Sequence, residues 1–227
     1  MLHQDLVENL AKELKIAPLS IIRENLEMEV LNEISKTKLT NNLIFYGGTA
    51  LRLAYNSFRF SEGLDFLLTK NSKSDEKELK IALNNVVKNN PGVVLEEVIE
   101  KRNTLFGLLK INHTLLKHPI RIKIEICKKK NGIKKENKLL ISPTTNLEVI
   151  FPTVDLESIY KTKLEALKNR DLARDWFDLW YLNQKLNNKQ KPDKKFNFNK
   201  QEFAKELKRF LPQNKWNIIQ TVIKFYE

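Results

Sequence analysis

The sequence predicts a fold that mixes helices and strands, α/β in the broad sense that includes α+β. We expect a mixed sheet flanked by helices, followed by a C-terminal helical domain. Short apolar, β-prone runs alternate with helical patterns in the first two thirds of the chain. From Thr153 onward the pattern is helical throughout. Because the type of pattern changes there, we expect an α/β domain over residues 1–150 and a helical bundle over residues 151–227.

The chain begins with the periodicity of two helices, over residues 4–35. A single proline, Pro18, separates two series of apolar residues at four-residue steps, which are Leu6, Leu10 and Leu14, then Ile22, Leu26, Val30 and Ile34. We expect this pair to cover the sheet, and we assign it no chemistry.

The next stretch predicts a strand, a turn and a helix. Leu43–Tyr46 is short, apolar and β-prone, and Gly47-Gly48 interrupts it. Thr49 is then the expected N-cap of the helix. In such a turn the backbone N–H groups and the helix N-terminus face outward, so a phosphate can bind them without an intervening side chain.

A second strand, Leu64–Leu68, carries an acid beside this turn. Asp65 alternates with Leu64 and Phe66, so its side chain points away from their face. An acid fixed next to an anion-binding turn is what metal-assisted phosphoryl chemistry requires. Gly-Gly turns are common, however, and a strand-end aspartate often only caps a loop, so spacing alone leaves both interpretations open.

A helix over Asp75–Asn89, with Ser74 as its candidate N-cap, is expected to end at the Asn-Pro-Gly turn that follows. Three strand patterns come next, at Val93–Ile99, Leu105–Ile111 and Ile120–Cys127. In the last strand the isoleucines share one face, and the other face carries Arg121, Lys123 and Glu125. Residues 131–143 are polar and lysine-rich, which predicts a loop or hairpin end.

In the helical half, a helix from Asp155 presents an apolar stripe on which Lys163 falls. A lysine there either snorkels to the surface or meets a partner, because an unpaired buried ammonium is costly. The next helix carries acids at i, i+4 and i+7, and its Arg174 can reach one of them along the helix; the acids are Asp171, Asp175 and Asp178. The simple interpretation is a surface of weak ion pairs.

The end of the chain predicts a flexible, basic connection over residues 187–200, followed by helices around Phe203–Leu211 and Trp216–Phe225. No internal repeat is present in the sequence.

Composition limits the function classes. The 227 residues are 41% hydrophobic and carry a net charge of +12, which favours a polyanionic partner such as nucleic acid. A bias towards Lys, Asn and Ile can also arise from base composition, which weakens that inference.

No apolar run is long enough to span a bilayer, and the N-terminus lacks a signal-peptide pattern, so we expect a cytoplasmic protein with no membrane partner. The single cysteine, Cys127, excludes an internal disulfide and is expected to be a buried, inert thiol.

Several of these motifs together resemble the AbiEii/AbiGii toxin family of nucleotidyltransferase-like proteins, whose fold is polymerase-β-like. The first resemblance is GGTAL followed by RFSEGLDF, which keeps the family residues Gly47, Gly48, Thr49, Arg59, Ser61 and Asp65. The lysine-leucine-x-alanine-leucine helix at Lys163 and the Arg-Asp-x-x-Asp-Leu signature at Arg174 extend it, so that it covers about residues 40–182.

The resemblance implies a nucleotidyltransferase in a toxin–antitoxin system, transferring a nucleotide from a nucleoside triphosphate to an acceptor such as tRNA. It implies Mg²⁺ or Mn²⁺ on Asp65 and Glu125, with Lys163 and Asp175 completing the catalytic residues. The nucleotide-binding residues it implies are Gly47, Gly48, Thr49, Arg59, Ser61, Lys163 and Arg174. It further implies an RNA acceptor and an antitoxin protein as partners.

One departure from the family pattern affects all of this. Gly63 stands where the family has the first of two metal-binding aspartates, and Glu62 points the other way by alternation. Catalysis is therefore expected to be impaired. Gly63 is either an inactivating change in a toxic protein, a feature of a naturally silent relative, or part of a remodelled, weakly active site. The alternative function is a catalytically silent RNA- or protein-binding module on the same fold.

Overall fold

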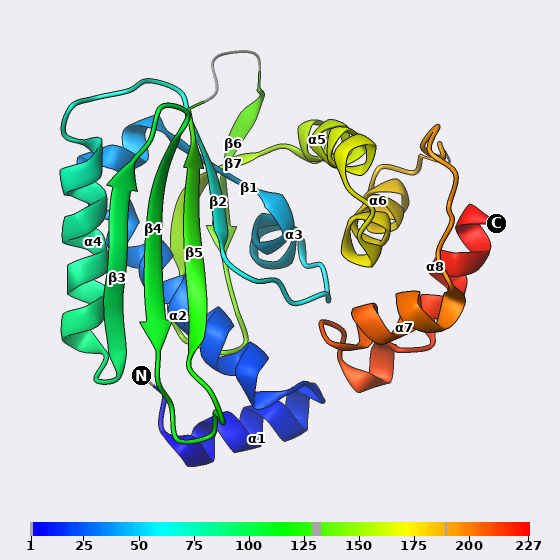
Figure 1. Ribbon diagram of the computed structural model, residues 1–227, viewed down its shortest axis with the longest axis horizontal. Coiled ribbons are helices and arrows are strands. Elements are labelled where there is room, and N and C mark those ends of the chain that lie inside the picture. The colour runs from blue at the N-terminus through cyan, green and yellow to red at the C-terminus, as the bar shows by residue number, and fades with distance from the viewer. Residues whose placement is uncertain (1, 129–132, 189) are drawn as a thin grey trace.

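The computed structural model describes residues 2–128, 133–188 and 190–227 (Figure 1). Its strands form one seven-stranded sheet in the order β3-β4-β5-β2-β1-β7-β6. The strands are β1 Leu43–Tyr46, β2 Leu64–Leu68, β3 Val93–Glu100, β4 Thr104–Ile111, β5 Ile120–Cys127, β6 Lys135–Leu140 and β7 Val149–Val154. The sheet is mixed, because β2 pairs with β5 and β1 pairs with β7 in parallel, while the other neighbours are antiparallel.

One group of helices packs along the sheet, and a second group lies beyond it, on the right in Figure 1. The first helices are α1 Gln4–Leu14, α2 Pro18–Ser35, α3 Gly47–Tyr55 and α4 Asp75–Asn89. The helical group contains α5 Leu156–Asn169, α6 Ala173–Lys185, α7 Lys200–Lys208 and α8 Ile218–Tyr226. Short 3₁₀ segments lie at Lys38–Asn42 and Gln213–Lys215. No helix in the described ranges is long and apolar enough to cross a membrane.

The predicted α/β class is confirmed, and so are most of its elements. Pro18 is the first residue of α2, where its missing N–H costs no hydrogen bond. Helix α4 has the predicted bounds, although the side chain of Ser74 makes no capping hydrogen bond. The prediction for Thr49 was wrong. Helix α3 begins two residues earlier, at Gly47, and the Thr49 hydroxyl instead donates to the Gly63 carbonyl at 2.6 Å.

Two strands were missed. Residues 135–140, predicted as loop, form β6; residues 131 and 132 of that predicted loop lie outside the described residues. Strand β6 is at the sheet edge and mostly exposed, so its sequence lacks the apolar alternation that marks a half-buried strand. Strand β7 contains Pro152, which reduces its strand signal. The sheet therefore continues past residue 150 to Val154, and the division into two domains stays a prediction.

The helical group begins at a well-defined cap. The Asp155 carboxylate accepts a hydrogen bond from the Ser158 backbone N–H at 2.7 Å, which satisfies one unpaired donor at the start of α5. After α6, the predicted basic connection leads to α7 and α8, which match the two predicted terminal helices closely.

A buried network of charges joins the sheet to the helical group. Arg59, in the loop before β2, makes two hydrogen bonds to Asp178 of α6, at 2.7 and 2.8 Å. Lys163 of α5 reaches the same carboxylate at 2.6 Å. Both residues are almost completely buried, with 2% relative exposure for Arg59 and 0% for Asp178. These charges are therefore paired almost entirely with one another.

The same network includes Asp175, which accepts from Lys163 at 2.9 Å and from Arg170 at 2.7 Å. The simple interpretation, a surface stripe of intrahelical ion pairs, therefore does not hold. Asp175 and Asp178 are buried, and Arg174 lies 3.7 Å from Glu62 instead of pairing with Asp178. Helical spacing shows which residues share a face, but it does not show which distant segment covers that face.

We predict that Arg59→Ala destabilises the fold strongly, because it leaves the Asp178 carboxylate buried with only one cation. The expected loss is about 3–5 kcal/mol in the free energy of unfolding, measured by urea denaturation. Arg121→Ala is the control, because Arg121 pairs with Glu96 on the surface. The role given to the network is contradicted if both variants unfold at the same urea concentration.

Asp175 predicts a pH dependence of stability. Burial raises its pKa, but Lys163 and Arg170 outweigh burial and hold the pKa at about 2, below the usual value of 3.8 for an aspartate. A carboxyl with a lowered folded pKa stabilises the fold above about pH 4. That contribution is lost as the pH falls from about 4 to about 2. We expect Asp175→Asn to flatten the pH dependence of urea unfolding in this range. Asp5→Asn, which changes an exposed carboxyl, should keep the parent's dependence.

Candidate active site

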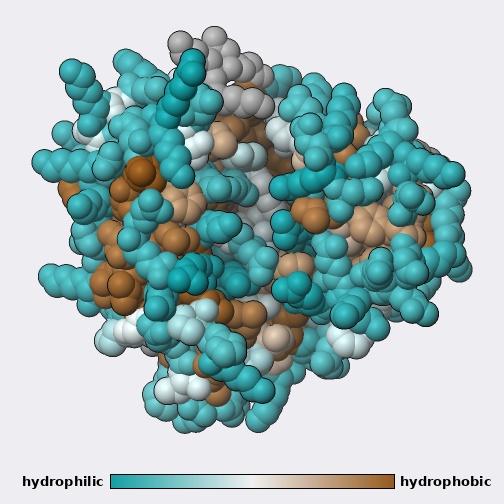
Figure 2. All heavy atoms as spheres, in the orientation of Figure 1, coloured by the Kyte–Doolittle hydropathy of each residue, from teal (hydrophilic) through white to brown (hydrophobic). Residues whose placement is uncertain are grey.

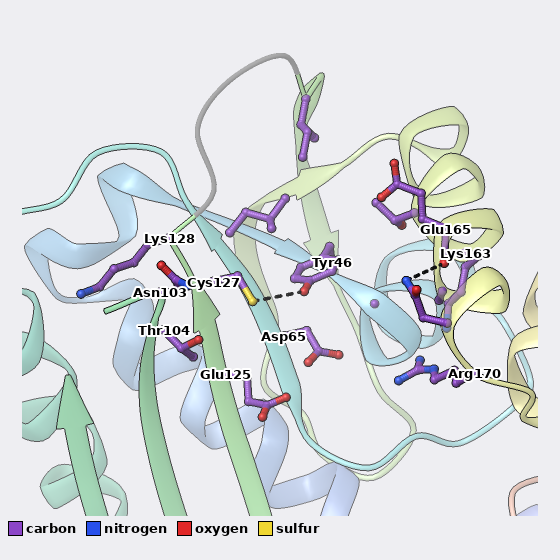
Figure 3. A pocket seen from close by; sticks show the side chains of 16 residues that line it. Tyr46, Asp65, Asn103, Thr104, Glu125, Cys127, Lys128, Lys163, Glu165 and Arg170 are labelled. Atoms are coloured by element: carbon purple, nitrogen blue, oxygen red, sulfur yellow. Dashed lines mark hydrogen bonds between the residues drawn. The ribbon is translucent and has the colours of Figure 1, made fainter. Parts of the chain in front are cut away.

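Two cavities meet at the junction of the sheet and the helical group. The larger one, of about 670 Å³, lies between the sheet and α5, and Figure 3 shows the side chains that line it. The smaller one, of about 400 Å³, is rich in arginine and lysine. Four residues line both cavities, namely Asp65, Glu125, Lys163 and Arg170. The junction therefore sets two acids from the sheet opposite two cations from the helical half.

The two acids are direct neighbours. Asp65 of β2 and Glu125 of β5 are partners in the parallel register, and both side chains point into the same space (Figure 3). Burial raises the pKa of Asp65 to about 6; the Lys163 ammonium lowers it, and the Glu125 carboxylate adds to the rise. A desolvated carboxylate beside a second one is stabilised by any cation placed between them.

This pair fits one divalent cation. Among the described residues no cluster of three or more His, Cys, Asp or Glu side chains could hold a metal. Mg²⁺ is commonly held by one or two carboxylates together with substrate phosphates and water. Asp65 and Glu125 meet that requirement when a phosphate supplies further oxygens. The two acids alone provide a smaller ligand set than a pair of aspartates plus a third acid.

Gly63 occupies a position that cannot take a carboxylate without a backbone shift. Its φ is +96°, and a Cβ there would lie 2.7 Å from the backbone oxygen of Lys123. Both backbone groups of Gly63 are hydrogen-bonded: its N–H donates to Glu27 at 2.7 Å, and its carbonyl accepts from Thr49. The neighbouring Glu62 is bound to Arg23 at 3.0 Å, consistent with the expectation that it does not replace the missing ligand.

Positions 47 and 48 require glycine because other side chains of the protein lie against the backbone there. A Cβ on Gly47 would lie 2.5 Å from an Asp65 carboxylate oxygen. A Cβ on Gly48 would lie 2.5 Å from an Arg59 guanidinium nitrogen and 2.7 Å from the Ser61 hydroxyl. The turn therefore makes room for three protein side chains at the N-terminus of α3. The negative charge of Asp65 is favourable there, because the helix N-terminus carries a partial positive charge.

The structure brings together most of the residues predicted for the site. All of them line one of the two cavities except Thr49 and Asp175, which are buried behind the cavity walls. Thr49 holds Gly63, and Asp175 holds Lys163 and Arg170. Arg59 reaches the smaller cavity, but its guanidinium is already bound to Asp178. Arg59 and Asp175 are thus placed to position other groups.

Sequence reasoning missed several residues of the site. Arg170 lines both cavities, and Arg23 and Lys123 line the smaller one. Lys123 shares a strand face with Glu125, so alternation could have identified it. Arg23 comes from α2, where nothing in the helical periodicity marks a role in the site.

The prediction for Cys127 was partly wrong. Its thiol is half-buried and lines the larger cavity, where the Tyr46 hydroxyl approaches its sulfur at 3.8 Å (Figure 3). Burial raises the pKa of Tyr46, and the nearby Asp65 carboxylate adds to the rise, so the phenol stays protonated.

The model of the family described as "Nucleotidyl transferase AbiEii toxin, Type IV TA system" matches residues 29–220. None of the curated proteins compared with the chain matches it.

Two solved structures show the same fold. The protein JHP933 from Helicobacter pylori is 21% identical with a TM-score of 0.55, over 93% of this chain and 80% of that one. The nucleotidyltransferase toxin MenT4 from Mycobacterium tuberculosis H37Rv is 20% identical with a TM-score of 0.60, over 91% of this chain and 69% of that one. At these identities the likeness concerns the fold alone. The family model, however, spans most of the sequence, and the chain therefore belongs to the AbiEii nucleotidyltransferase toxin family.

Proposed function

We propose that this protein transfers a nucleotide from a nucleoside triphosphate to a hydroxyl of an RNA acceptor such as tRNA, with release of pyrophosphate, as the toxin of a toxin–antitoxin pair. The observation that carries the proposal is the register of Asp65 with Glu125 at the meeting point of the two cavities. Two adjoining compartments with acids at their junction suit a reaction that joins two substrates. An antitoxin protein would be the partner that controls it.

The residues divide into those that touch substrate and those that position them. Asp65 and Glu125 would hold Mg²⁺ or Mn²⁺, and a bound divalent cation supplies neutralisation of phosphate charge. Lys163, Ser61 and Arg174 line the cavities and would contact phosphate oxygens together with the turn at Gly47 and Gly48.

The remaining predicted residues act through these contacts. Arg59 and Asp175 would orient Lys163 through the buried charge network, and Thr49 would hold the backbone of Gly63. The smaller cavity is the natural place for a triphosphate, because arginine and lysine dominate its lining. The larger cavity, whose lining includes Leu67, Ile133 and Ala166, suits a less charged group such as a nucleobase.

We infer that catalysis is impaired relative to a site with both aspartates, because Gly63 offers no oxygen ligand. The hydrogen bonds from Thr49 and to Glu27 support the explanation that Gly63 belongs to a remodelled site, since the surrounding residues match its unusual backbone. The alternative function, a catalytically silent RNA- or protein-binding module, is favoured by the same missing ligand. RNA binding without metal and without nucleotide transfer would distinguish it.

The first test is nucleotide transfer. The protein is incubated with Mg²⁺ or Mn²⁺, each labelled nucleoside triphosphate in turn, and total tRNA or total protein as acceptor. We expect labelled RNA, and we expect Asp65→Asn or Glu125→Gln to reduce the rate by about 100-fold or more through loss of charge stabilisation. Glu157→Gln, an exposed acid on α5, is the control and should keep the parent's rate.

Failure of transfer with every nucleotide and acceptor would contradict the proposed activity. If the same protein then bound RNA in the presence of EDTA, the silent binding module would replace it. Transfer that survived in both acid variants would show instead that the reaction does not depend on this carboxylate pair.

The second test concerns position 63. Because a side chain there would meet the Lys123 backbone oxygen, we expect Gly63→Asp to lower the melting temperature and not to raise transfer. The strain of a non-glycine residue at positive φ is about 1–2 kcal/mol, which lowers the melting temperature by roughly 2–8 °C in a chain of this size. Lys70→Asp, which adds a carboxylate to an exposed loop, is the control. A stable Gly63→Asp variant with faster transfer would contradict this account.

A further inference from the structure

A row of side chains crosses five strands and passes through the acid pair. Asp65 is paired with Tyr46 on one side and with Glu125 on the other, Glu125 with Phe106, and Phe106 with Ile99. Residues directly opposite each other in a sheet project from the same face. Phe106 is therefore the cross-strand neighbour of Glu125 on the side away from Asp65.

This face of β3, β4 and β5 is open. Helix α4 packs on the opposite face, where Leu79 and Leu83 approach Gly107. In Figure 1 no helix lies in front of these three strands. Val94 is 49% exposed and Ile99 is 37% exposed, and Phe106 and Leu108 are half-buried. Figure 2 shows the corresponding apolar area, interrupted by hydrophilic side chains.

Lysines are interleaved with these apolar residues. Lys110 is the register partner of Val94, and Lys123 is the partner of Leu108. Within the described ranges neither lysine lies within ion-pair distance of an acid, although Lys110 is near enough to Glu96, the partner of Arg121, to help lower its pKa. A third lysine, Lys101, places its ammonium 5.4 Å from the centre of the Phe106 ring. The face thus offers one aromatic ring, several aliphatic side chains and lysines on β4 and β5, with the acids Glu96 and Glu97 at its β3 edge.

Single-stranded nucleic acid matches this combination. Bases stack on aromatic side chains in a sequence-tolerant way, and lysines neutralise the phosphates between them. A protein partner matches it less well, because charged residues, lysine in particular, are depleted in the core of protein interfaces. The face also runs directly into Glu125 and Asp65, so a strand bound on it would lead to the proposed reaction centre.

We propose that the open face of β3, β4 and β5 binds the single-stranded end of the RNA acceptor, with one base stacked on Phe106. Lys110 neutralises a phosphate of that strand. The identification of the occupant as RNA rests on the proposed function, whereas the surface itself is assigned from register, exposure and charge. In this arrangement the acceptor approaches the acid pair across the sheet, while the triphosphate occupies the arginine-rich cavity.

The test is the binding of a fluorescein-labelled, unstructured RNA of 12 nucleotides, measured by fluorescence anisotropy in EDTA. We expect Phe106→Ala to weaken binding by about tenfold, because one base loses its stacking partner. Phe106→Tyr keeps an aromatic face and should bind like the parent. Ile150→Ala is the matched control, since Ile150 is an exposed apolar residue on the distant strand β7.

The phosphate contact has its own control. In a plot of log affinity against log salt concentration, Lys110→Ala should reduce the slope by about one unit. Lys80→Ala should leave the slope unchanged, because Lys80 is an exposed residue of α4, on the opposite side of the sheet. The proposal is overturned if the parent does not bind the RNA, or if Phe106→Ala binds as tightly as Ile150→Ala. Phe106-dependent self-association in gel filtration would overturn it as well.

Because the binding assay contains neither divalent metal nor nucleoside triphosphate, its result does not depend on catalysis. RNA binding that depends on Phe106, together with a failed transfer assay, would support the surface and contradict the enzymatic function. Transfer without any effect of Phe106→Ala on RNA binding would support the function and contradict the surface.

Discussion

The pairing of Arg59 with Asp178 is the interaction on which the site depends. A buried ion pair contributes little net stability, because desolvation of both charges offsets their attraction, but separating the two partners is strongly unfavourable. Arg59 lies a few residues before β2, and Asp178 lies on α6. Helix α6 therefore cannot move away from β2 without leaving a charge uncompensated. The two halves of the site are fixed relative to each other by electrostatics as well as by apolar packing.

The same network determines the charge that the acid pair faces. Lys163 divides its ammonium between Asp175 and Asp178, and it also lowers the pKa of Asp65 against the effect of burial. A lysine in an apolar helical stripe is thereby kept in place next to the sheet. The residues that hold it, Asp175 and Asp178, make no contact with a substrate in the proposed function. Their contribution to that function is the position of Lys163.

Local patterns in the sequence predicted the elements whose environment is simple. Strand β5 alternates because one of its faces is buried and the other is open, and α4 has one apolar stripe. Strand β6 was missed because an exposed edge strand needs no such pattern. Helical spacing alone left the role of the α6 acids open, because their partners lie elsewhere in the chain; Arg59 and Asp178 are 119 residues apart. Family resemblance located these residues, but only the fold shows which are buried and which line a cavity.

The backbone conformation of Gly63 is a constraint that cannot be seen by comparing residue types between sequences. If only a carboxylate had been lost, the backbone could keep a conformation open to any residue. Here φ is +96° and the Lys123 backbone oxygen occupies the space of a side chain. Glu27, whose pKa is raised by burial, accepts a hydrogen bond from the Gly63 N–H. In the proposed function, a cation on Asp65 and Glu125 must then take its remaining ligands from phosphate and water. Cation and nucleotide would consequently bind together, since each completes the site for the other.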